Sequence, residues 1–355
     1  MYIRKYYNVI YELHFMIFTC NIINVMRSVS DTQQHYKAGR TGSIMAVNNI
    51  GHINEYGLPL NANTWLETHH ESKSIERNRM IRDLQLEQGS FVVDAGCGPG
   101  LWTPLLAQAI GPAGRILGID ISAEALITAQ KRSSTTWYRH QVQYKRASLE
   151  QLPIFRGSAD IVFSANVSQY LSNPVQTFAS MGPYLKQGGR LIVKDIDFGT
   201  LRFHNVDAGL QARVFQAREQ WERVRIDHGY AFEDSWVGSK LAAYLRAAGF
   251  SDVQEHTYKI VRHFPISRDF RAYLQGIVEW FVCEDAPYLS QHDATQWLQC
   301  FFDVEHNVFD QASFVSEETE FVATGIWNGS YSPRYFDIHA ELSLNEEHLL
   351  LPVLD

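Results

Sequence analysis

The sequence lacks the cysteine patterns and long apolar runs that mark metal-binding, secreted and membrane proteins. Its four cysteines among 355 residues are Cys20, Cys97, Cys283 and Cys300. None of them is paired at the spacing of a zinc site or a disulfide framework, which favours a reducing, cytoplasmic location. The segment from Met1 to Met26 is rich in Ile, Phe and Tyr, but Glu12 and His14 interrupt it well short of a membrane span, and no small-residue cleavage site follows. We therefore expect neither a metal site nor a membrane association.

Basic charge is scarce as well. The chain has 31 Lys and Arg against 39 Asp and Glu, a formal net charge of −8, and no Lys/Arg-rich run. Because nucleic-acid binding requires a basic patch, we expect no nucleic-acid partner. The hydrophobic fraction of 45% and the charged fraction of 20% are ordinary for a globular protein, so the chain can bury a core.

The first residues differ in character from those that follow. Residues 28–42 are polar and turn-prone, and Met45 opens a more typical sequence. We expect residues 1–44 to be disordered or to precede the true translation start. A chain that begins at Met45 should then keep its melting temperature and its ligand affinity.

Strand and helix patterns alternate in the middle of the chain. Short apolar, β-rich runs predict strands at 91–93, 115–119, 142–145, 161–163 and 190–193. Helical patterns predict helices at 64–86, 101–110, 123–132 and 175–185. This alternation implies parallel βαβ units in a doubly wound α/β sheet that is covered by helices on both faces.

After residue 193 the regular alternation ends. Helical patterns cover 211–227, 238–248, 267–283 and 293–309, and strand patterns cover 253–261 and 320–327. The helical region between the last two strands is larger than a hairpin connection needs. We therefore expect a core at 45–262, a helical insertion at 263–312, the last strand within 313–335 and a tail at 336–355.

The most informative segment is Asp94-Ala-Gly-Cys-Gly-Pro-Gly100, between the first predicted strand and the helix after it. Glycines suit this turn because a Cβ atom would keep the backbone away from a ligand lying across it. Twenty-four positions after Gly96, Asp120 ends the second predicted strand. A carboxylate at that position can accept both hydroxyl hydrogens of a ribose, so the pattern predicts a nucleotide-binding site.

The order of the glycines distinguishes between nucleotides. A dinucleotide fingerprint needs a third Gly or Ala where this chain has Leu101, whereas here the order is G-x-G-x-G preceded by Asp94. This D-x-G-C-G-x-G order resembles the class I S-adenosylmethionine (SAM) dependent methyltransferases, in particular their UbiE-like and small-molecule branch. By element order the resemblance runs from Thr64 to Gly249. It implies a Rossmann-like, doubly wound sheet of seven strands, mostly parallel with an antiparallel last strand, and SAM as the cofactor.

The resemblance also implies roles for individual residues. The loop from Asp94 to Gly100 would hold the methionine half of SAM, with Asp94 near the ammonium, and Asp120 would take the ribose hydroxyls. Ser148 stands where the family has an acid that meets the adenine amino group, in the segment from Ala147 to Pro153. The expected cofactor-binding residues are Asp94, Gly96, Cys97, Gly98, Gly100, Asp120, Ile121, Ser148, Leu149 and Asn166.

The resemblance also places Ile121 and Asn166 along the cofactor. Ile121 would lie along the adenine face, and the backbone of Asn166 would line the cofactor beside the reacting centre. Each assignment also has a structural alternative that the sequence leaves open. The glycines can serve a tight turn, Asp120 can cap the helix that starts near Ser122, and Asn166 can satisfy loop backbone.

The acceptor is less well defined than the cofactor. SAM brings an electrophilic methyl group, and the protein needs a base only when the nucleophile must lose a proton. The candidates for such a base are Asp195, Asp197 and His204, each of which also has a structural explanation. The residues expected near the acceptor are Gln169, Tyr170, Phe198 and Trp236, together with Phe203, Trp221 and Tyr230. They favour a small, flat or aromatic metabolite that is methylated on O, N or C.

Several alternatives remain at this level. Asn166 is followed by Val-Ser-Gln rather than by the Pro-Pro-aromatic sequence of methyltransferases that act on base or glutamine amino groups. The helical insertion would cover the acceptor site or form a homodimer contact. A nicotinamide-dependent oxidoreductase and a non-catalytic SAM-binding module are the rival functions. His69-His70-Glu71 lacks the second histidine spacing of a zinc-protease helix.

Overall fold

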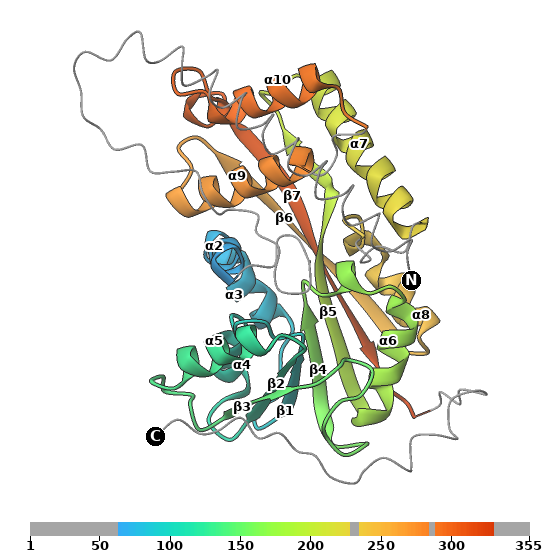
Figure 1. Ribbon diagram of the computed structural model, residues 1–355. Helices are drawn as coiled ribbons and strands as arrows, with labels where there is room; N and C mark the ends of the chain where they lie inside the picture. Colours follow the sequence, from blue (N-terminus) through green and yellow to red (C-terminus); the bar gives the residue numbers. More distant parts are fainter. Residues whose placement is uncertain (1–62, 228–233, 284–287, 330–355) are drawn as a thin grey trace, which may run out of the picture.

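The computed structural model describes residues 63–227, 234–283 and 288–329 (Figure 1). The expectations for residues 1–44 and 336–355, and for Tyr230, lie outside these described residues.

Seven strands within the described residues form one sheet, in the order β3-β2-β1-β4-β5-β7-β6. The strands are β1 (Phe91–Ala95), β2 (Arg115–Asp120), β3 (Val142–Arg146), β4 (Ala159–Ala165), β5 (Leu185–Phe203), β6 (Ser251–His263) and β7 (Val315–Ile326). Strands β1 to β5 pair in parallel, and β7 runs antiparallel to both β5 and β6. The predicted doubly wound sheet with an antiparallel last strand is confirmed.

Helices cover both faces of this sheet. They are α2 (Asn63–Ser72), α3 (Ser74–Asp83), α4 (Thr103–Ile110), α5 (Ala123–Ser133), α6 (Pro174–Met181), α7 (Ala208–Asp227), α8 (Leu241–Ala247), α9 (Arg268–Cys283) and α10 (Gln291–Phe302). On one face, Met80 of α3 and Leu106 of α4 belong to the same apolar cluster as Val92. On the other face, Phe178 of α6 clusters with Val93. Neighbouring strand residues face opposite sides, so a sheet covered on both faces requires continuous apolar runs such as that of β1.

The single helix predicted at 64–86 is wrong in one respect. The structure has two helices there, α2 and α3, because Lys73 between them leaves the helical conformation (φ −122°, ψ 22°). The Lys73 ammonium is fully buried against the carboxylates of Glu318 and Glu320. This long-range contact is absent from the local pattern, which therefore shows an unbroken helix.

Two other predicted helices are too long. The helix predicted at 293–309 ends as α10, and the carboxylate of Asp303 then accepts the backbone N–H groups of Glu305 and His306, which turns the chain. The helix predicted at 175–185 ends as α6 and is followed by a single 3-10 turn at 182–184. The other predicted helices differ from the structure by a few residues at their ends.

The strands predicted at 190–193 and 320–327 are much longer in the structure, as β5 and β7. Beyond a register shift the two strands pair again, with Arg202 opposite Glu317. The apolar pattern hides this length because charged residues such as Lys194 stand in the middle of the buried run. The sheet therefore extends well past the carboxyl ends of β1 to β4.

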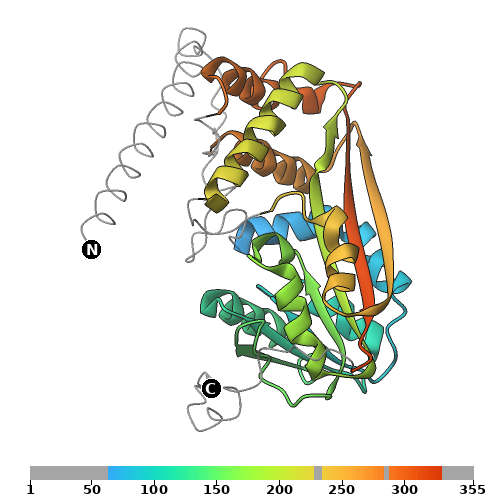
Figure 2. The same ribbon diagram turned by 90° about the vertical axis from the view of Figure 1, so that its right-hand side faces the viewer.

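The extended ends of β5, β6 and β7 carry a second helical layer. These strands run from the parallel half of the sheet to the region where α7, α9 and α10 gather (Figures 1 and 2). We call this region the cap, comprising those three helices with residues 198–203 of β5 and 315–319 of β7. Its aromatic side chains pack closely, and the ring centroids of Phe203 and Phe301 lie 4.7 Å apart. Helices α9 and α10 lie between β6 and β7 in the chain, within the range predicted as a helical insertion.

Candidate functional site

A cavity of about 470 Å³ lies beside the carboxyl ends of β1, β2 and β4. Of the ten residues predicted to bind the cofactor, eight line it: Gly96, Cys97, Gly98, Asp120, Ile121, Ser148, Leu149 and Asn166. Asp94, near the end of β1, and Gly100, in the loop that follows, are not lining residues. The chain thus brings together, at one edge of the sheet, side chains that follow four different strands.

The glycine loop at residues 96–100 needs glycine for different reasons at each position. Gly96, Gly98 and Gly100 all have left-handed backbone conformations, with φ of 77°, 51° and 73°. A Cβ atom at Gly96 would lie 2.5 Å from the Val167 side chain, and one at Gly100 would lie 2.9 Å from the Tyr144 hydroxyl. At Gly98 a Cβ atom would meet nothing closer than Leu66, at 3.9 Å. Gly98 is therefore the glycine whose missing side chain leaves room on the cavity side.

Asp120 joins the glycine loop to the next helix. Its Oδ2 accepts the backbone N–H of Gly98 at 2.8 Å, and its Oδ1 accepts the N–H of Ser122 at 2.9 Å. The residue that caps α5 is Ser122, whose Oγ accepts the N–H of Ala125 at 3.0 Å. Asp120 is therefore not the N-cap of α5, and its carboxylate stands at the cavity between two loops.

Asp94 lies beneath the glycine loop and is almost completely buried. Its Oδ2 has no hydrogen-bond partner among the described residues. Burial, and next the negative charge of Asp120, raises the pKa of the Asp94 carboxyl to about 7. A buried carboxyl with an unpaired oxygen is well suited to a cationic group such as an ammonium.

At the end of the cavity near β3, the segment from Ala147 to Glu150 forms the wall. Ser148 Oγ is hydrogen-bonded to the Glu150 carboxylate, and Thr177 Oγ1 donates to the other oxygen of Glu150 at 3.3 Å. Glu150 also lines the cavity. The family pattern has an acid where this chain has Ser148. The chain has an acid two positions later instead, at Glu150, which the sequence analysis did not name as a site residue.

The wall that faces the glycine loop comes from α2, α3 and the loop after β4. We call it the facing wall; its residues are Leu66, His69, Arg77, Asn166, Val167, Tyr170 and Leu171. Asn166 has a left-handed backbone with φ of 59°. Its N–H donates to the carbonyl of Lys194 at 2.8 Å, and its Oδ1 accepts the Lys194 Nζ at 2.6 Å. The strand β5 therefore fixes both the backbone and the side chain of Asn166.

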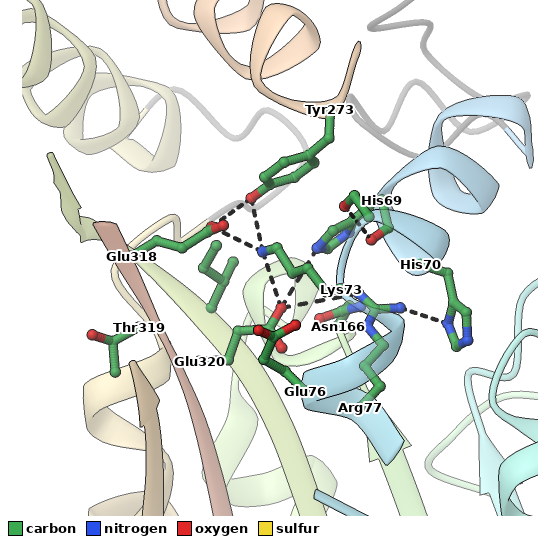
Figure 3. Close-up of polar contacts among 12 residues, drawn as sticks. His69, His70, Lys73, Glu76, Arg77, Asn166, Tyr273, Glu318, Thr319 and Glu320 are labelled. Atoms are coloured by element: carbon green, nitrogen blue, oxygen red, sulfur yellow. Dashed lines mark hydrogen bonds and ion pairs between the residues drawn. The ribbon is translucent and has the colours of Figure 1, made fainter. Parts of the chain in front are cut away.

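Arg77 of the facing wall belongs to a buried group of charges (Figure 3). We call it the charge cluster; it consists of Lys73, Arg77, Lys194, Glu318 and Glu320, all at most 2% exposed. Lys73 Nζ lies 2.8 Å from Glu318 and 3.1 Å from Glu320, and Lys194 Nζ lies 2.8 Å from Glu320. The Tyr273 hydroxyl of α9 donates to Glu318 at 2.7 Å. The cluster therefore ties α2, α3, β5, β7 and the cap together.

The charge cluster has three formal cations and two formal carboxylates. Burial would raise the pKa of Glu320, but the charges of Lys194 and Lys73 hold it well below its usual value. Burial lowers the pKa of Lys194 to about 8 and also lowers that of Arg77. Burial, and next the charge of Arg77, lowers the pKa of His70 to about 2, so this histidine adds no charge. One positive charge in the cluster is left without a carboxylate.

Arg77 is the cation of the cluster that reaches the cavity. Its Nη1 lies 2.6 Å from His70 Nδ1, and its Nη2 lies 3.9 Å from Glu320. Neither Nη2 nor Nε has a hydrogen-bond partner among the described residues. The guanidinium lies over the ring of Trp102, 5.1 Å from its centroid, just beyond the glycine loop.

The candidate bases lie away from the cavity lining. Asp195 is fully buried and accepts the N–H groups of Ile196 and Gln169, and burial raises its pKa to about 7. Asp197 accepts the N–H of Gly199. His204 is half exposed and lies 3.7 Å from a carboxylate oxygen of Glu317.

Among the residues expected near the acceptor, Tyr170 lines the cavity. Gln169 is buried below it, where its carbonyl accepts the N–H of Asp234 at 2.7 Å. Phe198 is in the aromatic core of the cap, with its centroid 5.0 Å from that of Trp280. Trp236 stands against Gly199, where a Cβ atom would lie 2.6 Å from the indole.

His69, Arg77 and Glu150 are site residues that sequence reasoning missed. Glu150 lies within the segment from Ala147 to Pro153 that resembles the family's adenine-binding segment, so its position was a usable signal. His69 and Arg77 precede the motif and carry no pattern of their own. Their importance comes from Glu318 and Glu320, which lie more than two hundred positions away in the chain.

Comparison with known proteins agrees with this geometry. Residues 93–193 match the family model of a methyltransferase domain. The chain is 33% identical over 172 residues to an uncharacterized 37.1 kDa protein in transposon TN4556 of Streptomyces fradiae, covering 48% of this chain and 46% of that protein. It is 28% identical over 135 residues to the demethylmenaquinone methyltransferase of Staphylococcus aureus, covering 37% of this chain and 53% of that protein. The chain thus matches about half the length of these curated relatives.

Among solved structures, the YcgJ protein of Bacillus subtilis aligns over 73% of this chain and 98% of its own, with a TM-score of 0.43 and 15% identity. Within the family match lie β1, the glycine loop, Asp120 and Asn166. The sheet order, this loop and the family match together define a SAM-dependent methyltransferase domain of the Rossmann-like class, as the sequence predicted. S-adenosylmethionine is the cofactor of this class.

The described residues were also searched for metal-binding groups and for membrane-spanning helices. They include no group of three or more His, Cys, Asp or Glu side chains arranged to hold a metal ion. No helix among them combines the length and the apolar character that a bilayer crossing requires.

Proposed function

We propose that the chain is a SAM-dependent methyltransferase that transfers the methyl group to an O, N or C atom of a small, flat or aromatic metabolite. The observation that carries this proposal is that one cavity is lined both by Gly98 and Asp120 and by His69, Asn166 and Tyr170 of the facing wall. A cofactor and an acceptor can meet there without a rearrangement of the sheet. The rival oxidoreductase function is not favoured, because Leu101 blocks the dinucleotide pattern and the family match is to a methyltransferase domain.

The residues present fit the cofactor. The unpaired, buried oxygen of Asp94 suits the ammonium of the methionine half, and Asp120 can exchange its bonds to Gly98 and Ser122 for ribose hydroxyls. Arg77, whose Nη2 and Nε have no hydrogen-bond partner among the described residues, suits the carboxylate of the methionine half. That carboxylate would also neutralise the positive charge that the cluster leaves uncompensated.

The facing wall supports the proposed acceptor class. Leu66, Val167 and Leu171 give it an apolar part, and Tyr170 adds an aromatic face. When bound, the cofactor supplies an electrophilic methyl group. The residues of the wall would then orient the acceptor atom toward it, which is the main contribution a protein makes to such a transfer. We also propose that α9 and α10 act as a cover over the acceptor side, because Tyr273 of α9 stacks on His69.

Two measurements test this function. Calorimetric titration with SAM and with NAD(H) should show binding of SAM and none of NAD(H); the reverse result would refute the proposal. Incubation with labelled SAM and a panel of phenols, amines and indoles should transfer label to at least one acceptor. SAM binding without transfer to any acceptor would instead favour the non-catalytic module.

A further inference from the structure

One polar side chain of the facing wall has no role in holding the cofactor as described above. His69 of α2 lines the cavity, although its side chain is only 4% exposed. Its ring stacks on Tyr273 of α9 with the centroids 4.8 Å apart, and the ring of Trp65 lies 4.9 Å away. Two aromatic rings therefore fix the imidazole where the cap meets the cavity; Figure 3 shows one of them, Tyr273, beside His69.

The carboxylate of Glu320 lies close to one nitrogen of the His69 ring, just beyond hydrogen-bond distance. The Nε2 atom lies 3.6 Å from Oε1 of Glu320, which the charges of Lys194 and Lys73 keep ionised. A carboxylate at this position favours the tautomer with Nε2–H, so Nδ1 keeps a lone pair. Among the described residues neither ring nitrogen of His69 makes a hydrogen bond, and of the two it is Nε2 that is buried without one. Burial, and next the charges of Lys73 and Arg77, lowers the pKa of His69, so the ring is neutral at rest.

We propose that Nδ1 of His69 receives the hydrogen of the acceptor's nucleophile, so that the acceptor is a neutral hydroxyl or N–H compound rather than an anion. A lone pair can accept a hydrogen bond only from a donor group, and an anionic nucleophile would present its own lone pairs to Nδ1. This assignment rests on the proposed methyltransferase function, and it narrows the acceptor class left open there.

The transfer balances with His69 as the base. The bond from the acceptor's oxygen or nitrogen to the methyl carbon forms, the bond from that carbon to sulfur breaks with its electron pair left on sulfur, and the acceptor's proton moves to Nδ1. The positive charge lost at sulfur appears on the imidazolium, so the total charge of the cavity stays the same. The negative charge of Glu320, whose Oε1 lies 3.6 Å from Nε2, favours the imidazolium and opposes part of the repulsion from Lys73 and Arg77.

The direct test is nitrogen NMR of the full chain with labelled histidine, bound to S-adenosylhomocysteine. Phenol is the hydroxyl probe, and toluene is the matched probe without an O–H group. We expect Nδ1 of His69, assigned by its loss in His69→Gln, to be unprotonated from about pH 6 to 8 and to shift with phenol but not with toluene. A protonated Nδ1, or a resonance that phenol does not shift, would overturn the proposal.

A second measurement separates the hydrogen bond from packing. His69→Phe keeps an aromatic ring between Trp65 and Tyr273 but removes the lone pair, so phenol should bind about five- to tenfold more weakly and toluene equally well. His140→Gln changes an exposed histidine outside the cavity lining and is the matched control, which should alter neither affinity. Equal phenol affinities for the wild type and His69→Phe would contradict the assignment.

The two levels of the proposal fail separately. SAM titration of the wild-type chain precedes both measurements. An absence of SAM binding refutes the proposed function, whereas normal SAM binding with an unresponsive Nδ1 refutes only the role of His69.

Discussion

The glycine loop and the charge cluster both contribute to one cavity, yet they are built in different ways. The loop is held by neighbours in the chain or on the next strand, and its contacts are mainly backbone N–H groups that reach Ile119 and Asp120. The charge cluster joins side chains up to 247 positions apart, such as Lys73 and Glu320. A binding surface can thus be encoded by a short motif, whereas the attachment of the cap depends on pairs that form only in the complete fold.

The largest effect should come from removing the centre of the charge cluster. Glu320→Gln leaves Lys73, Lys194 and Arg77 facing one another with Glu318 as the remaining carboxylate, and breaking a buried pair costs about 3–5 kcal/mol of unfolding free energy. Urea unfolding measures this loss.

Glu317→Gln is the matched control for that variant. Glu317 is on the same strand but is 24% exposed, where it pairs with Lys259 at 2.6 Å. Exposed pairs contribute little, so the control should lose less than about 1 kcal/mol. Similar losses of unfolding free energy for the two variants would mean that the buried cluster stabilises the fold no more than an exposed ion pair does.

Asp94→Asn should raise the unfolding free energy, whereas Glu320→Gln lowers it. The reason is that the buried Asp94 carboxyl is destabilised when it is charged in the protein without ligand. The folded pKa of Asp94 is about 7, above the ordinary 3.8. Between about pH 4 and 7 the unfolded chain has released this proton and the folded chain has not, so the stability of the wild type falls as pH rises and stays low above 7.

Urea unfolding at about pH 5 and pH 8 tests that sign. The variant should be more stable than the wild type at pH 8, by up to about 4 kcal/mol, and the advantage should shrink at pH 5. SAM affinity should fall at the same time. Asp160→Asn is the control: its carboxyl has a lowered pKa because, although burial raises it, bonds from Lys186 and the Phe91 N–H outweigh burial, so this variant should lose stability. A pH-independent difference for Asp94→Asn would contradict the argument.

Asp120→Ala separates binding from folding on the loop side. Losing two charge-assisted hydrogen bonds to the ribose should weaken SAM binding tenfold or more, while unfolding free energy falls by about 1 kcal/mol. Asn173→Ala removes the N-cap of α6, outside the cavity, and should cost about 1 kcal/mol of stability without altering affinity. Calorimetric titration and thermal melts measure both quantities. Unchanged SAM affinity in Asp120→Ala would refute the ribose role.

The smallest change is Gly98→Ala. The backbone φ of 51° makes alanine unfavourable by about 1 kcal/mol, but no side chain lies closer than 3.9 Å to the new methyl group. The fold should therefore survive, while the methyl group obstructs the cavity and SAM affinity drops several-fold. Gly96→Ala, which meets Val167 at 2.5 Å, should lose more stability than Gly98→Ala. Equal melting temperatures for the two variants would argue against the different roles of these glycines.

The contrast between local motifs and long-range charge pairs also explains which features could be predicted from the sequence. The order of strands, the loop at Asp94 and the strand-terminal Asp120 follow from local patterns, because apolar runs and glycine turns report backbone geometry directly. The break at Lys73 and the full length of β5 were missed, since each depends on a charged residue buried by a partner far away in the chain. His69 and Arg77 can be recognised as site residues only from their contacts with Glu320, and no local periodicity in the sequence indicates such long-range contacts.

The length of β6 and β7 has a mechanical consequence. Their pairing runs without a register shift from Gln254 opposite Thr324, in the core, to His263 opposite Val315, in the cap. The same ladder of backbone hydrogen bonds supports both regions, so there is no hinge between them among the described residues. We therefore expect no rigid-body opening of the cap relative to the core. Ligand entry must then rely on side chains and connecting segments, and heating should melt cap and core in one cooperative transition.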